Sequence, residues 1–286
     1  MEKFTPFSPL PMGNTKLNRD PELRRKYKNI HSLMADYPPI IILCLDDAIA
    51  PLAQDMPLDE NRLYFLGLLN DKAYIAYDAQ NDLIDADWQH PRDIAAKQKV
   101  EEIGQVATAF GLARWHRHHQ FCPKCGQASQ PILLGEARQC TDNACQNITY
   151  PRIDPSMITL LTHQFEDGEK ALLIEMHGRN GMHTTISGFM SVGETLEETV
   201  IREIKEETNV IASDVRFIAS QPWPFPQSLM LGCRAVALTT DIAIEKEELV
   251  SANWFSKEEV IGLRGENKLP PLESIARHLI EQWLAT

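Results

Sequence analysis

Residues 188–210 read GFMSVGETLEETVIREIKEETNV, and this stretch decides how the chain around it is interpreted. Thr195 followed three positions later by Glu198 is a capping-box pattern, which predicts that a helix begins there. We expect this helix to extend to Thr208. Apolar residues recur at every fourth position and would face a hydrophobic core, namely Leu196, Val200 and Ile204.

Carboxylates gather on an adjacent face of this expected helix. Glu203, Glu206 and Glu207 stand at positions i, i+3 and i+4, so their side chains would converge. Like charges at this spacing destabilise a helix unless something neutralises them. Their oxygens suit hard divalent cations such as Mg²⁺ or Mn²⁺. The other interpretation is a solvated acidic face, and the helix alone does not separate the two.

The chain from 151 to 286 alternates strand and helix patterns around this helix. A second helix is expected from Leu272 to Leu284. This alternation predicts an α+β fold in which helices flank a mixed sheet. The expected strands are SMITLL, ALLIEM, TTISGF, DVRFIA, LMLGCRAVAL and ANWF.

The remainder of the chain divides by its texture into an N-terminal mixed α/β domain (1–120) and a short cysteine-rich segment (121–150). A helix should begin at Asp20-Pro21, because Asp favours the N-cap and Pro the first helical position. Another helix is expected from Asp93 to about His116. The expected strands here are PPIIILCL, RLYFLGLL and KAYIAYDA.

Composition restricts the classes of function. The formal net charge of -12 argues against broad electrostatic binding of nucleic acid, although a local basic pocket for one anion stays compatible with it. No apolar run approaches the roughly 20 residues of a membrane helix, and the N-terminus lacks a secretory signal pattern. We therefore expect a cytoplasmic protein.

Four of the six cysteines fall within 24 residues, with the spacing C-x2-C, fourteen residues, C-x4-C. Two such pairs can supply four thiolates to a tetrahedral zinc ion, and a complete set of four favours a structural site over a catalytic one. Buried or redox-active cysteines without metal are the alternative. The four are Cys122, Cys125, Cys140 and Cys145, whereas Cys44 and Cys233 lie in apolar strands and are expected in the core.

A histidine cluster precedes the cysteines in the segment WHRHHQ. His116, His118 and His119 are candidate metal ligands, but a solvated and partly cationic helix end is the favoured interpretation.

A proline-rich loop follows the helix in sequence, as SQPWPFPQSLM from Ser220 to Met230. Its prolines fix the backbone on either side of Trp223 and Phe225. Rigid aromatic side chains suit stacking on a flat heterocycle, while packing of the loop into a core is the alternative.

Several residues at fixed offsets resemble the Nudix box, G-x5-E-x7-R-E-U-x-E-E-x-G-U: Gly188, Glu194, Arg202, Glu203, Ile204, Glu206, Glu207 and Val210. One position departs from the pattern, because Asn209 stands where the box has its last glycine. We expect Asn209 to be tolerated, since Asn adopts the left-handed conformation more readily than most residues. Arg202 should pair with Glu194 and hold the preceding loop against the helix.

The box, the cysteine quartet, the segment YPRIDP (150–155) and the proline-rich loop together resemble the NADH pyrophosphatase branch of the Nudix family. The resemblance covers about 121–286. It implies the Nudix fold, a zinc ribbon at 121–150 and a Nudix hydrolase domain at 151–286. It further implies hydrolysis of NADH or NAD to nicotinamide mononucleotide and AMP, removal of NAD caps from RNA as a second activity, and a homodimer.

The resemblance also implies roles for individual residues. Glu203 and Glu207 would bind Mg²⁺ or Mn²⁺ together with the Ser187 carbonyl and Glu248, although Glu245 and Glu247 lie close in sequence. Glu206 would be another ligand or the base that orients water. The implied substrate-contacting residues are Tyr150, Phe189, Gln221, Pro222, Trp223, Pro224, Phe225, Pro226, Gln227, Ser228 and Ala276.

Two alternatives stay open at this point. The first is a Nudix pyrophosphatase for ADP-ribose or nucleoside triphosphates, because the whole family shares the box. The second is an RNA-binding or regulatory protein with a vestigial enzyme domain, against which the intact acidic residues and the negative net charge argue.

Overall fold

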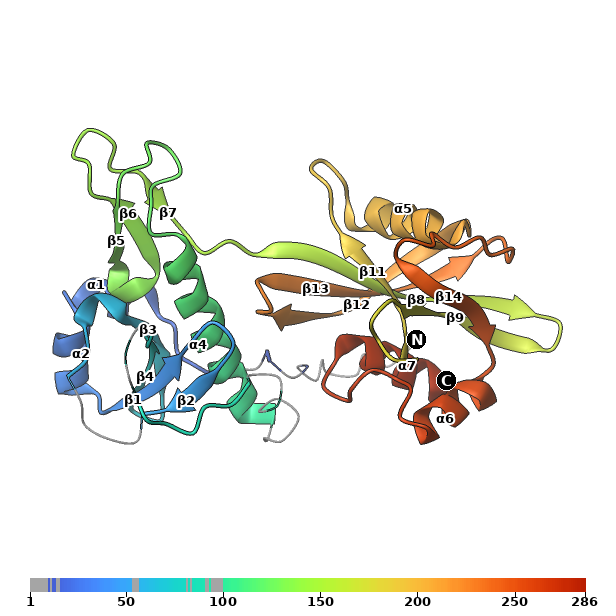
Figure 1. Ribbon diagram of the computed structural model, residues 1–286, viewed down its shortest axis with the longest axis horizontal. Coiled ribbons are helices and arrows are strands. Elements are labelled where there is room, and N and C mark those ends of the chain that lie inside the picture. Colours follow the sequence, from blue (N-terminus) through green and yellow to red (C-terminus); the bar gives the residue numbers. More distant parts are fainter. Residues whose placement is uncertain are drawn as a thin grey trace. The chain divides into compact units, whose positions relative to one another are not determined.

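The computed structural model describes residues 10, 12–13, 16–52, 57–80, 82, 84–90, 93 and 100–286. They form two compact units, and Figure 1 shows the elements of each. The C-terminal unit contains Asp154–Pro222 and Ser228–Thr286, whereas the N-terminal unit lies within Pro11–Ile153 and also includes Trp223–Gln227.

A seven-stranded mixed sheet forms the framework of the C-terminal unit. Its strands follow the order β10-β9-β8-β13-β12, with β11 also paired to β8 and β14 to β9. The β8–β13 pair is parallel, and the β8–β9, β8–β11 and β9–β14 pairs are antiparallel. The strands are β8 (Asp154–Phe165), β9 (Gly168–Met176), β10 (His183–Thr184), β11 (Ile186–Phe189), β12 (Ala212–Trp223), β13 (Ser228–Ala237) and β14 (Leu249–Phe255).

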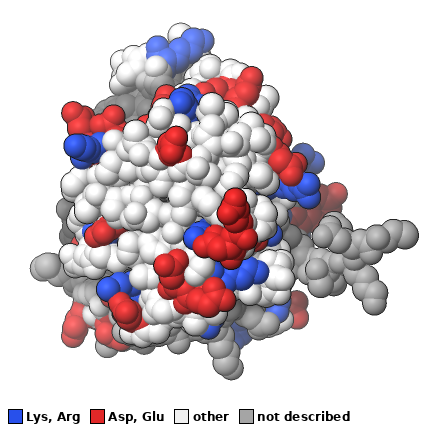
Figure 2. All heavy atoms as spheres, turned by 90° about the vertical axis from the view of Figure 1, so that its right-hand side faces the viewer, with Lys and Arg blue, Asp and Glu red and all other residues white. Residues whose placement is uncertain are grey.

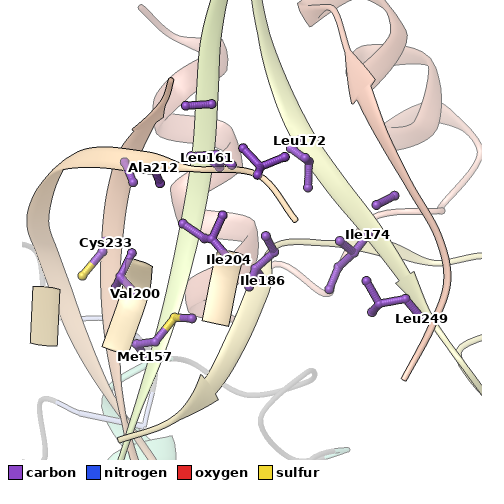
Figure 3. Packing of buried hydrophobic residues seen from close by; sticks show 14 residues of the cluster. Met157, Leu161, Leu172, Ile174, Ile186, Val200, Ile204, Ala212, Cys233 and Leu249 are labelled. Atoms are coloured by element: carbon purple, nitrogen blue, oxygen red, sulfur yellow. The ribbon is translucent and has the colours of Figure 1, made fainter. Parts of the chain in front are cut away.

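Helices cover both faces of this sheet, because successive side chains along a strand point to opposite faces. Met157 and Leu161 of β8 pack with α5 (Leu196–Thr208) in one cluster, whose close packing is drawn in Figure 3. Ile158 and Leu160 pack in a second cluster with α6 (Lys257–Gly265) and α7 (Ile275–Leu284). The helix that carries the acidic residues therefore lies on one face of the sheet.

The N-terminal unit has its own four-stranded sheet, ordered β2-β1-β4-β3, in which β1 and β4 are parallel. A second sheet of three short antiparallel strands, β5-β6-β7, includes Cys140, and the other three cysteines of the quartet lie in the segments before β5 and between β6 and β7. The elements are α1 (Pro21–Lys26), α2 (Ile30–Asp36), β1 (Pro39–Cys44), β2 (Ile49–Pro51), β3 (Leu63–Leu69), β4 (Lys72–Asp78), α4 (Val100–His118), β5 (Ser129–Ile132), β6 (Ala137–Cys140) and β7 (Ile148–Thr149).

The predicted long elements are present at the expected places, and the α+β class is confirmed. Asp20 caps α1 by accepting a hydrogen bond from the Glu22 N–H. The predicted strand 184–189 is wrong as a single element, because Thr185 separates β10, paired with β9, from β11, paired with β8. The expected start of α4 near Asp93 adjoins residues outside the described part of the chain.

The surface of one face agrees with the acidic composition. Figure 2 shows Asp and Glu side chains interspersed with fewer Lys and Arg around a broad uncharged area, so this face offers no continuous basic surface. Within the described residues, no helix is both long and apolar enough to cross a membrane.

Candidate active site

Helix α5 begins and ends where its sequence signals place it. The Thr195 hydroxyl accepts a hydrogen bond from the Glu198 N–H at 3.2 Å, and the Glu198 carboxylate accepts one from the Thr195 N–H at 2.8 Å. Asn209 ends the helix in the left-handed conformation, with φ of 62°. The capping box and the left-handed conformation expected of Asn209 are therefore both confirmed, whereas its tolerance in the Nudix pattern stays a prediction.

Burial of one helix face sets the direction of the acidic side chains. Val200 and Ile204 are fully buried against the sheet, as predicted, and Leu196 packs at the edge of the same cluster. On the adjacent face of the helix, Glu207 is buried and Glu203 is partly shielded from solvent. The Glu206 side chain, in contrast, is 60% exposed. The three carboxylates thus occupy different environments.

Gly188 lies against the Glu203 carboxylate, because β11 passes close to α5. A Cβ atom at position 188 would stand 2.0 Å from Glu203 Cδ. The glycine carbonyl accepts a hydrogen bond from the Ser156 hydroxyl at 2.9 Å, which fixes the strand there. Glycine is therefore required by close approach, and Ser187 comes directly before this contact.

Glu207 is the most deeply buried carboxylate of the site, with 4% of the residue exposed. Its Oε2 atom has no hydrogen-bond partner among the described residues. Burial, followed by the charges of Glu203, Glu248 and Glu206, raises the pKa of Glu207 to about 8. Burial also raises the pKa of Glu203, against the opposing effect of Arg202.

Glu248 lies in a turn that begins at Glu245, where the backbone is hydrogen-bonded to α5. The Glu245 N–H donates to the Glu207 carbonyl at 3.0 Å, and the Glu248 N–H donates to the Glu245 carbonyl at 3.2 Å. The Glu248 charge contributes to the raised pKa values of both Glu203 and Glu207. This electrostatic effect favours Glu248 over Glu245 and Glu247 as the fourth carboxylate.

Arg202 links the helix to the loop before it. Its guanidinium donates to both Glu194 oxygens at 2.6 and 2.9 Å and to the Phe189 carbonyl at 3.0 Å, so the predicted pairing with Glu194 is confirmed. This pairing lowers the pKa of Glu194 to about 2. Arg202 Nη1 also donates to Glu203 at 2.9 Å and to Glu206 at 2.8 Å. These two contacts were not predicted; the i,i+4 spacing could have suggested the one with Glu206, whereas neighbouring residues such as Arg202 and Glu203 do not normally face each other on a helix.

Together these groups have the chemistry of a divalent cation site. Glu203, Glu207 and Glu248 offer hard oxygen donors, and the unpartnered Glu207 oxygen is a buried polar atom that a cation would satisfy. A dense set of carboxylates also needs a counter-charge before it can accept an anionic substrate.

The four predicted cysteines meet at one point in the N-terminal unit, with all sulfur atoms within 4.8 Å of one another. Cys122 and Cys145 Sγ are 3.8 Å apart, and Cys125 and Cys140 Sγ are 3.4 Å apart. Tetrahedral zinc with Zn–S bonds of about 2.3 Å requires sulfur separations of roughly 3.8 Å. The quartet therefore fits a structural zinc ion.

One sequence expectation near the ribbon is wrong. His116 is not solvated but 1% exposed, because its ring stacks on Tyr64 at 3.8 Å between centroids. Its Nε2 contacts the Gly135 carbonyl at 2.8 Å, and Arg138 contacts Nδ1 at 3.1 Å. Burial lowers the pKa of His116 to about 3, so the ring is neutral. His118 is exposed, as expected of a helix end.

Comparison with protein families agrees with both sites. The NUDIX domain profile matches residues 159–282, and the NADH pyrophosphatase zinc ribbon domain profile matches residues 117–150. The chain contains a Nudix domain preceded by an NADH pyrophosphatase zinc ribbon. The two matches include the cysteine quartet and helix α5.

Several named proteins are similar to large parts of the chain. The human NAD-capped RNA hydrolase NUDT12 is 39% identical over 212 residues, which are 68% of this chain and 45% of that protein. The Macaca fascicularis protein of the same name is 33% identical over 95% of this chain and 63% of its own length. NAD-capped RNA hydrolase NudC of Salmonella schwarzengrund is 39% identical over 61% of this chain and 63% of that protein. The chain thus spans about half to two thirds of these relatives.

The residues predicted to contact substrate in this Nudix chain lie on several segments. Tyr150 directly follows β7 and is 60% exposed, and Phe189 ends β11 and is 57% exposed, so both rings are accessible in their own units. In the proline-rich loop, Phe225 packs against Phe110 at 5.3 Å and Trp223 at 5.4 Å between ring centroids. The loop aromatics are therefore half-buried.

Gln221, Ser228 and Ala276 are instead buried. The Gln221 side-chain amide is hydrogen-bonded to the backbone at the start of α7. Ala276 lies in the first turn of that helix. Their contact with a substrate stays a prediction.

Proposed function

We propose that this Nudix hydrolase cleaves the pyrophosphate bond of NADH or NAD into nicotinamide mononucleotide and AMP, and that it also removes NAD caps from RNA. The observation that carries the proposal is the buried, unpartnered Oε2 atom of Glu207, on which the charges of Glu203 and Glu248 act, in a chain that also has the NADH pyrophosphatase zinc ribbon. The names of the relatives support the RNA activity.

The residues around Gly188 would hold the cofactor. Glu203, Glu207, Glu248 and the Ser187 carbonyl are the proposed ligands of Mg²⁺ or Mn²⁺. When bound, a divalent cation offsets the charge of the diphosphate and lowers the pKa of a water molecule. Gly188 leaves the space that the Glu203 carboxylate occupies.

Protein side chains would position the substrate and the attacking water. Arg202 fixes Glu203 and Glu206 and holds the loop that ends at Phe189, so these groups need little reorganisation when substrate binds. Glu206 is the most exposed of the three helix carboxylates, and its oxygen is either a further ligand or the acceptor of a proton from the attacking water. Tyr150, Phe189 and the loop 221–228 would bind the base and the nicotinamide ring.

We further infer a homodimer located in the cytoplasm, with zinc in a structural role. The resemblance supports the dimer, and the free cysteines of the described residues agree with a reducing compartment. Sedimentation with and without NADH would test the oligomeric state.

Product analysis tests the proposed function. Purified protein is incubated separately with NADH, ADP-ribose, a nucleoside triphosphate and NAD-capped RNA, with Mg²⁺ or Mn²⁺, and the products are identified by mass spectrometry. We expect reduced nicotinamide mononucleotide and AMP from NADH, and a 5′-monophosphate end on the RNA. Preferred cleavage of ADP-ribose or a triphosphate would retain the Nudix chemistry and overturn the assigned substrate. A complete lack of turnover would favour a binding role.

A further inference from the structure

Gln221 lies near the end of β12, at the start of the proline-rich loop, and its side chain is fully buried. Its Nε2 donates to the Glu273 carbonyl at 2.7 Å, and its Oε1 accepts from the Ile275 N–H at 2.9 Å. Both ends of one amide therefore bind backbone more than 50 residues further along the chain. The contact lies entirely within the C-terminal unit.

The Ile275 N–H is one of the donors that a helix start leaves without an internal partner. The N-cap residue Ser274 satisfies a different donor, because its hydroxyl accepts from the Arg277 N–H at 3.2 Å. Gln221 thus completes the start of α7 from a neighbouring strand. An apolar residue at 221 would leave the buried Ile275 N–H and the partly buried Glu273 carbonyl without these hydrogen bonds.

The neighbouring strand β13 has a glycine at the point where Ile275 packs against it. At Gly232 of β13, a Cβ atom would stand 2.6 Å from Ile275 Cδ1 and 3.2 Å from the Ala219 carbonyl oxygen. The absence of a side chain at 232 lets Ile275 lie against the sheet beside β12. Hydrogen bonds from Gln221 and close packing at Gly232 therefore fix the same turn of α7.

This turn matters because it contains Ala276, which the resemblance places in the substrate site. The other predicted substrate segment, 221–228, begins at Gln221 itself. We propose that Gln221 is a positioning residue, whose amide fixes the base of the proline-rich loop to the first turn of α7 for binding of the dinucleotide. This inference rests on the proposed function, since the loop and Ala276 are assigned to substrate there.

The test compares Gln221→Leu with Gln221→Glu and Ser274→Ala in the full chain. Leu has a similar size and removes both hydrogen bonds, whereas Glu retains an acceptor for the Ile275 N–H and loses the donor to the Glu273 carbonyl. Ser274→Ala weakens the same helix start through a different hydrogen bond. Steady-state kinetics with NADH and amide hydrogen exchange at Ile275 are measured for each variant.

We expect Gln221→Leu to raise KM for NADH about tenfold with kcat within about twofold, and to speed amide exchange at Ile275, because two hydrogen bonds are lost. Gln221→Glu should give a smaller change in KM. Ser274→Ala should lower the melting temperature and leave KM within about twofold.

Two results would overturn the inference. One is an unchanged KM in Gln221→Leu although exchange at Ile275 is faster, and the other is an equal rise of KM in Ser274→Ala, which would assign the effect to helix stability alone. If wild-type protein releases no mononucleotide from NADH, the proposed function fails instead, and the exchange data still report whether Gln221 fixes α7.

Discussion

At position 207 a carboxylate is buried with one oxygen unpartnered, and this arrangement has a thermodynamic cost in the absence of a cation. Glutamate titrates near pH 4.3 in an unfolded chain, whereas the pKa of Glu207 is raised to about 8. Between these values the folded state binds a proton that the unfolded state releases. Stability of the metal-free protein therefore falls as the pH rises through this range.

Glu207→Gln should consequently have opposite effects on stability and activity. We expect the melting temperature of the chelator-treated protein to rise by a few degrees near pH 9 and to change little near pH 5, because the amide carries no charge. Turnover with metal should fall about 100-fold or more. Calorimetry with a chelator and NADH hydrolysis check the two effects, and near-normal turnover would contradict the proposed metal site.

Gly188→Ala tests the close approach of β11 to Glu203. The added methyl group would overlap the carboxylate, so Glu203 must move, and a displacement of about 1 Å can cost roughly 100-fold in rate. Gly262→Ala is the matched control, because position 262 lies in α6 with open space around it. Equal activity of the two alanine variants would show that the approach does not matter.

At the scale of single residues, the sequence named the acidic groups but not their environments. The Nudix pattern includes Gly188 and Glu203 as separate positions, and only the fold brings them into contact. The burial of Glu207 and the attachment of Gln221 to α7 depend on partners more than 30 residues away. No local spacing contains that information.

At the scale of elements, Asn209 is the clearest test of local conformation. Its φ of 62° is costly for most side chains, by about 1–2 kcal/mol. Asn209→Ala should therefore destabilise the protein by about 1 kcal/mol, whereas Asn209→Gly should be close to neutral despite loss of the hydrogen bond from Lys205. Urea unfolding of both variants measures the difference. A smaller cost for alanine than for glycine would contradict a left-handed end of α5.

Local signals explain which elements could be predicted. Helix α5 has a capping box, a four-residue apolar period and a helix-ending Asn, all of which agree. Helix α6 also has a capping box, formed by Ser256 and Glu259, which the sequence argument overlooked. The ribbon strands are only two to four residues long, so they have no periodicity to detect.

At the scale of the whole molecule, the cysteine quartet should separate zinc binding from general core stability. Cys122→Ser removes one of four sulfur ligands, so we expect loss of zinc and a lower melting temperature of the N-terminal unit. Cys233→Ala is the control, because Cys233 is buried in the C-terminal core away from the quartet in sequence. It should lower stability but retain zinc, as measured by atomic absorption. Full zinc content in Cys122→Ser would contradict the ribbon assignment.

The order of ribbon and Nudix domain was predictable because short motifs mark each of them. In contrast, the sequence could not predict that Trp223–Gln227 belongs to the N-terminal unit. The prolines indicate a rigid loop but do not indicate which residues it packs against. The burial of His116 was missed for the same reason, since its stacking partner Tyr64 lies in a distant strand.

The neutral His116 has a consequence for how the protein tolerates acid. Histidine in an unfolded chain takes up a proton near pH 6.5, whereas the folded ring resists protonation until about pH 3. Acid therefore weakens the N-terminal unit below pH 6.5, whereas rising pH weakens the C-terminal unit from about pH 4.3 to 8 through Glu207. The two buried groups thus offset each other between about pH 4.3 and 6.5, and on their account the metal-free chain should withstand heat best in this mildly acidic range.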